Sequence, residues 1–225
     1  MILRRSFLTR FGAAMSAGVA GVSLVRPQPA AAATNFDPAR HSQDDWFDQI
    51  PGKHRLVFDT TSPEGFGSAL LFARNYLDAN KNEYGLEDSD SAIVIVARHR
   101  ATAFGYNDAT WAKYGKTITQ RTNFNDPKTK EAPNFNLFLA SGYGQQLTNN
   151  GSTADALAKR GVHFGVCKMA TRGMSQLLAT ATGGNADKIN EELLAGLVNN
   201  GRGVPAGIVA VNRAQERGYS FAYGV

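Results

Sequence analysis

Apolar residues follow two different periods along the chain from residue 54 onward, which is typical of alternating strands and helices. The run from Ala92 to Ala97 is continuously apolar and rich in β-branched residues, which indicates a strand covered on both faces. Before it, apolar residues recur every three or four positions, as on one face of a helix. That face consists of Phe66, Leu70, Ala73 and Leu77. Ser62 is expected to cap this helix and Gly85 to end it, after a first strand at 55–59.

The same alternation continues to the end of the chain. The expected elements are a short helix from about Ser152 to Gly161, a strand at 162–167, helices at 170–182, 186–198 and 205–217, and a strand at 219–223. Strands separated by helices pair side by side in one direction, because the crossover helices cover the faces of the sheet. The pattern therefore predicts an α/β fold, a three-layer α/β/α sandwich with a mostly parallel sheet.

Two segments lie outside this alternation. Residues 34–53 are expected to form an N-terminal arm anchored by Trp46 and Phe47. Residues 116–150 are rich in Asn, Thr, Lys and Gly, with a short strand or turn at 135–139, and predict a long excursion. A connection of that length is usually a lid, a contact surface or partly disordered.

The first ten residues resemble a twin-arginine export signal. Arg4 and Arg5 are followed by Phe7 and Leu8, then by a weakly apolar Gly/Ala-rich stretch and by four alanines that end at Ala33. The stretch is too short and too interrupted for a membrane span, which needs about 20 apolar residues. We therefore expect a signal peptide at 1–33, a mature protein in the periplasm or cell envelope, and no stable membrane anchor after cleavage.

Charge changes once this leader is set aside. The full chain has 24 basic and 19 acidic residues, and residues 1–33 contain four arginines and no acid, so the net charge falls from +5 to +1. A nearly neutral domain gives no reason to expect nucleic acid as a partner. About 190 residues suffice for one core, so 54–225 is expected to form a single domain.

Several common site motifs are absent. The sequence contains no G-x-G-x-x-G, no P-loop, no G-x-S-x-G, and no paired Cys-x-x-Cys or His-x-x-x-His, so no cofactor and no metal are expected. His163 and Cys167 lie four residues apart on a predicted strand, about 13 Å along it, which is too far to share one ion.

Three strand ends carry polar side chains, and they should meet at one edge of a parallel sheet. Asp59 ends the first strand and Cys167 ends the third. Cys167 is the only cysteine and precedes a helix, whose N-terminus favours a thiolate, with Lys168 and Arg172 adding positive charge. It is either a nucleophilic or sulfur-carrying thiol, or a small apolar residue that closes the strand.

The second strand ends in Arg98-His99-Arg100. Such a triplet can bind an anion or supply a proton-transfer group. It can equally be a solvated strand end in which one arginine pairs with Asp59 or Asp108. A non-catalytic periplasmic binding protein or an oligomeric interaction protein that uses this edge is therefore the competing hypothesis.

The chain resembles the DsrE/DsrF-like family, small α/β proteins associated with sulfur relay. The resemblance rests on the order of elements, on residues 161–167 with the helix that follows, and on residues 204–207 leading to 215–219. It implies that Cys167, the only cysteine, carries persulfide sulfur. Our leading hypothesis adds that Lys168, Arg172 and His99 tune or contact the anionic sulfur species. It also implies a sulfur-donor or acceptor protein or a small anion as partner, and a homo-oligomer.

Overall fold

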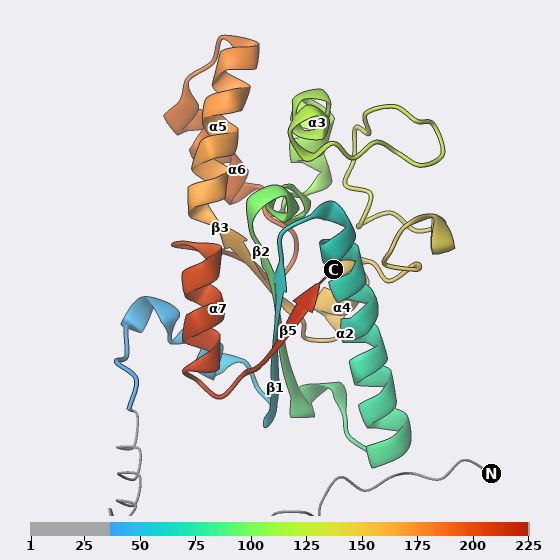
Figure 1. Cartoon of the computed structure of the whole chain (residues 1–225), viewed down its shortest axis with the longest axis vertical. Helices are drawn as coiled ribbons and strands as arrows, with labels where there is room; N and C mark the ends of the chain where they lie inside the picture. Colours follow the sequence, from blue (N-terminus) through green and yellow to red (C-terminus); the bar gives the residue numbers. More distant parts are fainter. Residues whose placement is uncertain (1–36, 225) are drawn as a thin grey trace, which may run out of the picture. The chain divides into compact units, whose positions relative to one another are not determined.

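The computed structural model describes residues 37–224, which contain a five-stranded sheet in the order β4-β3-β2-β1-β5. All the neighbouring strands in it pair in parallel. The strands are β1 (His54–Thr60), β2 (Ser91–Ala97), β3 (His163–Cys167), β4 (Gly201–Val204) and β5 (Ser220–Gly224). The predicted α/β/α sandwich is confirmed, and every strand points toward the same end of the sheet (Figure 1).

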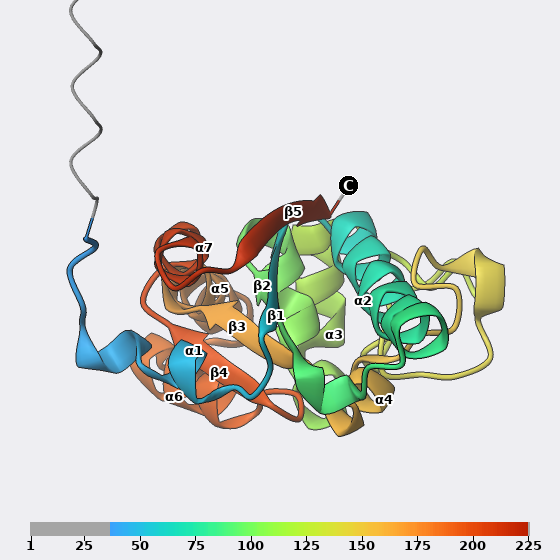
Figure 2. The ribbon, with the colours of Figure 1, turned by 90° about the horizontal axis from the view of Figure 1, so that it is seen from below.

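Helices cover both faces of this sheet. They are α1 (Trp46–Gln49), α2 (Pro63–Tyr84), α3 (Asp108–Thr122), α4 (Ala154–Lys159), α5 (Lys168–Thr182), α6 (Ala186–Ala195) and α7 (Gly207–Gln215). Figure 2 shows α1 and α7 on one side of the sheet and α2 and α4 on the other. Two buried apolar clusters correspond to these faces, the larger on the α2 side and the smaller on the α7 side.

Local signals place the first βαβ unit as expected. The Ser62 hydroxyl accepts a hydrogen bond from the Gly65 amide at the start of α2, and Gly85 ends the helix in the left-handed conformation at φ 66°. Strand β2 is buried along its whole length, as its continuous apolar run indicates. On the α7 face, Trp46 and Phe47 are buried among the residues of the smaller cluster.

Residues 116–150, which were expected to form a long excursion, begin with helix and pack partly into the core. Helix α3 continues to Thr122 and ends at Asn123, whose φ of 55° is left-handed, so the excursion begins seven residues later than predicted. Residues 135–139 form a turn closed by a hydrogen bond from the Leu139 amide to the Asn136 carbonyl. Leu137 and Phe138 are fully buried in the larger cluster. The excursion therefore contributes these side chains to the core, while its residues 128–132 and 144–146 are exposed.

Strand β4 was not predicted. Its four residues, Gly-Arg-Gly-Val, contain one apolar side chain and carry no local strand pattern. Their extended conformation is set by pairing with β3, where Cys167 lies opposite Val204. Two helices are also shorter than predicted. The helix expected at 186–198 ends at Ala195. The helix expected at 205–217 begins at Gly207 and ends at Gln215.

The predicted signal peptide, with Arg4 and Arg5, lies outside the described residues. Within residues 37–224, none of the helices combines the length and apolar character that crossing a membrane requires.

Candidate functional site

A pocket of about 440 Å³ opens at the carboxyl ends of the strands. Helix α5 follows β3 and packs Met174 and Leu178 into the larger cluster, whereas α7 follows β4 and packs Ala210 and Val211 into the smaller one. The chain thus leaves β3 toward one face of the sheet and leaves the neighbouring β4 toward the other face. A crevice forms between the two connections, at the position where open α/β sheets bind their ligands. The pocket is lined by Arg98, His99, Arg121, Cys167, Met169, Ala170, Gly173, Met174, Ala206, Gly207 and Ile208.

Cys167 is the N-cap of α5 and lines this pocket. Its Sγ accepts a hydrogen bond from the Ala170 amide at 3.4 Å, and 6% of the residue is exposed. Its carbonyl accepts a hydrogen bond from the Thr171 hydroxyl, which in turn accepts one from the buried Tyr106 hydroxyl. The Ala170 amide thus orients the thiol at the first turn of α5, and the two hydroxyls hold the backbone of Cys167 in place.

Arg98 binds Asp59 through both carboxylate oxygens. The Arg98 Nε donates to Asp59 Oδ1 at 2.7 Å, and an Nη atom donates to Oδ2 at 2.8 Å. This hydrogen-bonded pairing with Asp59 is the main reason that the pKa of Arg98 is raised above its ordinary value. The sequence offered Asp59 or Asp108 as its partner, and the structure selects Asp59. Arg98 lines the pocket, but its charge is already matched.

His99 and Arg121 are the polar groups at the pocket that have no such match. His99 is exposed and adopts a left-handed φ of 56°, which is uncommon for a residue with a side chain. Arg121 lies in the last turn of α3 and is exposed. Among residues 37–224, neither side chain has a hydrogen-bond or ion-pair partner. Arg121 was missed because its segment was interpreted as loop, although the apolar spacing of Trp111, Tyr114 and Ile118 continues the helix toward it.

The other predicted site residues lie away from the pocket lining. Arg100 donates to the Thr122 carbonyl at 3.5 Å. Lys168 is exposed, and its stem lies close to Gly203 of β4. Arg172 faces Asp187 of α6 at 3.9 Å. The structure thus brings together Cys167, His99 and the Arg98–Asp59 pair, and it adds Arg121 in the place of Lys168 and Arg172.

This arrangement combines a thiol, two unmatched donors and an apolar rim. Met169 and Ile208 at the rim are 71% and 58% exposed. A small anion can be held by Arg121 and His99 with its reactive atom toward Cys167 Sγ, while its apolar part contacts the rim. Within the described part of the chain, no group of three or more His, Cys, Asp or Glu side chains is placed to hold a metal ion.

Comparison with known proteins adds no further assignment: the chain matches no family model, no curated protein and no solved structure.

Proposed function

We propose that this chain is an exported DsrE/DsrF-like protein that carries sulfur on Cys167. The observation that supports the proposal best is the position of the thiol, at the N-terminus of the 15-residue helix α5 and in the wall of a pocket. A sulfur carrier needs a nucleophilic sulfur, access for a small donor, and positive charge for an anionic donor. Cys167, the pocket and Arg121 are the features that support the proposal on these three points.

The proposed step is transfer of a sulfane sulfur. The Cys167 thiolate, its proton having gone to solvent, attacks the outer sulfur of a donor such as thiosulfate. A new S–S bond forms on Cys167 as the S–S bond of thiosulfate breaks, and sulfite leaves with the electron pair. The product is a Cys167 persulfide. An acceptor thiolate then attacks its outer sulfur, a new S–S bond forms on the acceptor, and the Cys167 thiolate leaves with the electron pair of the broken S–S bond. No external oxidant or reductant is required.

The test uses the purified full-length protein, in which Cys167 is the only cysteine. Native protein is treated with iodoacetamide at a series of pH values, and a second sample is incubated with thiosulfate before its intact mass is measured. We expect alkylation of the native thiol and the added mass of one sulfur atom, removable by a reductant. Cys167→Ser is the control. A thiol that reacts only after denaturation and acquires no sulfur would contradict the proposal.

A second candidate is a non-catalytic periplasmic protein that binds a small anion at the same edge. The unmatched Arg121 and His99 favour it, because they can hold an anion whether or not the thiol reacts. Binding of thiosulfate or sulfate that survives Cys167→Ser, together with an unreactive native thiol, would favour this function over sulfur transfer.

Export is tested separately. Replacing Arg4 and Arg5 by lysine is expected to retain the unprocessed precursor in the cytoplasm, as judged by fractionation. Processing and export that continue unchanged would exclude the twin-arginine route.

A further inference from the structure

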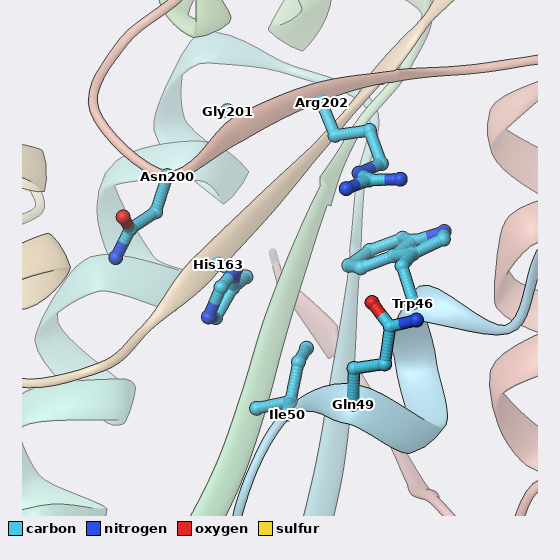
Figure 3. A pocket seen from close by; sticks show the side chains of 7 residues that line it. All are labelled: Trp46, Gln49, Ile50, His163, Asn200, Gly201 and Arg202. Atoms are coloured by element: carbon cyan, nitrogen blue, oxygen red, sulfur yellow. The ribbon is translucent and has the colours of Figure 1, made fainter.

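A second pocket lies at the amino ends of β3 and β4, at the opposite end of the sheet from Cys167. It encloses about 230 Å³ between helix α1 and the two strands. Figure 3 shows its lining, in which Trp46, Gln49 and Ile50 come from the arm, His163 from β3 and Arg202 from β4. Nothing in the sulfur chemistry proposed above involves this pocket.

Arg202 supplies an unused positive group to this pocket. Its Cζ atom lies 5.4 Å from the centroid of the Trp46 ring, and Figure 3 shows the guanidinium beside that ring. Stacking on an aromatic face orients a guanidinium but leaves the N–H donors along its edge free. Among residues 37–224, no carboxylate pairs with Arg202 and no acceptor takes its hydrogen bonds. Its five N–H donors are therefore available to a ligand.

His163 faces the same space without adding a charge of its own at neutral pH. The residue is half-buried, and its ring lies 6.5 Å from that of Trp46. Burial and then the charge of Arg202 lower the pKa of His163 below its ordinary 6.5. A neutral imidazole offers one donor and one acceptor. On its other side, a hollow contains Lys159 and the ion pair of Arg160 with Asp88, so no unmatched acid faces His163 there.

The remaining walls are apolar or neutral. Trp46 and Ile50 are nearly buried, at 5% and 4% exposure, and Gln49 contributes an amide. A cation at one end, an apolar wall and a small volume together suit a short acid better than a sugar or a large anion. We propose that this pocket binds a short-chain monocarboxylate, with its carboxylate on the edge of Arg202 and its alkyl part against Trp46 and Ile50.

The probe is butyrate, added to the full-length protein and followed through the indole N–H signals of its two tryptophans by NMR. Trp46 lines the pocket, whereas Trp111 is fully buried and donates its Nε1–H to the Ala103 carbonyl, so it serves as an internal reference. We expect saturable shifts of the Trp46 signal in the millimolar range and none of Trp111. Butyramide has the same shape without the charge and is expected to produce no saturable shift.

Arg202→Gln is expected to weaken butyrate binding about tenfold or more, as loss of a charge-assisted contact would. Arg172→Gln removes the same charge from the exposed face of α5 and should leave the affinity unchanged. Equal loss in the two variants, equal binding of butyramide, or the absence of a saturable Trp46 shift would each overturn the proposal. These outcomes do not depend on the reactivity of Cys167.

A second readout follows from His163. A bound carboxylate offsets the positive charge of Arg202, so the pKa of His163 should rise when butyrate binds. The affinity for butyrate should therefore increase as pH falls through the range in which His163 titrates. The His163 ring signal, assigned with His163→Asn, is followed against pH with and without butyrate. If the titration midpoint of His163 does not move at butyrate concentrations that saturate the shift of the Trp46 signal, no carboxylate binds beside His163.

Discussion

Arg98 and Asp59 join the ends of two neighbouring parallel strands through a two-pronged ion pair, with N–O distances of 2.7 and 2.8 Å. The side chain of Asp59 is buried, with 4% of its surface exposed. Arg98 is the first residue after β2. This pair separates the roles within the Arg98-His99-Arg100 triplet. Arg98 neutralises a buried carboxylate, so His99 is the one member of the triplet that lines the pocket without a hydrogen-bond or ion-pair partner among residues 37–224.

Arg98→Ala is therefore expected to destabilise the protein by about 2–4 kcal/mol, because it leaves Asp59 buried without a partner. Arg100→Ala removes only a 3.5 Å hydrogen bond to the Thr122 carbonyl and should cost less than about 0.5 kcal/mol. Urea unfolding of the two variants measures both values. Similar stabilities for the two would show that the Asp59 pair contributes little.

Arg121→Gln should slow persulfide formation from thiosulfate about tenfold, because the unmatched cation at the pocket is lost. Lys168→Gln removes an equal charge next to Cys167 in the sequence, but outside the pocket lining, and should change the rate little. Initial rates of sulfur uptake by intact mass compare the two. A larger effect of Lys168 would indicate that charge close in sequence, and not the pocket, attracts the donor.

Gly207→Ala tests the contact between α7 and Arg98. A methyl group at Gly207 would lie 2.5 Å from Arg98 Cβ, so α7 or Arg98 must move, at a cost of about 1–3 kcal/mol. Gly173 lines the same pocket but lies within α5, and a methyl group there meets nothing within 4 Å. Gly173→Ala should instead be neutral or stabilise by up to about 1 kcal/mol. Thermal unfolding distinguishes the two signs.

Asp88 should make stability depend on pH in acid. The hydrogen bond from Arg160 is the main cause that lowers the pKa of Asp88 in the folded protein. A lowered pKa contributes stability above the unfolded value near 3.8, and this stability is lost as pH falls through the folded value. Asp88→Asn should cost about 1 kcal/mol at pH 7, since the pair is partly solvated, and almost nothing at pH 2.

Asp187→Asn is the matched control for Asp88→Asn, because Asp187 is 84% exposed and lies 3.9 Å from Arg172. It should leave stability unchanged at both pH values. A difference between wild type and Asp88→Asn that stays constant from pH 7 to pH 2 would contradict the assigned ion pair.

Asn136 joins the excursion to the segment between β2 and α3. Its buried amide donates to the carbonyls of Phe104 and Tyr106 at 2.9 and 2.7 Å. Asn136→Ala leaves both carbonyls without this donor, so a loss of about 2–4 kcal/mol is expected. Asn134→Ala, at an exposed neighbouring position, should have little effect. Equal unfolding midpoints for these two variants would show that the excursion is not held in this way.

Local signals in the sequence were enough for the fold class and for most elements. The apolar run of β2, the helical spacing of α2 and its Ser62 cap act within one element, so they can be recognised without knowing the neighbours. Parallel pairing also places all strand ends at one edge, which is why Asp59, His99 and Cys167 were expected near one another. Export, sulfur transfer and the family resemblance stay predictions.

Tertiary structure alone decided which of these side chains share the pocket. Strand β4 has no apolar pattern and exists through its pairing with β3, and it is the change of face after β4 that opens the crevice beside Cys167. Arg121 lines this crevice although it precedes Cys167 by 46 residues in the sequence. Lys168 directly follows Cys167 in the sequence but is not part of the pocket lining. Periodicity specifies which face of an element is buried, but contacts between elements determine which charges meet.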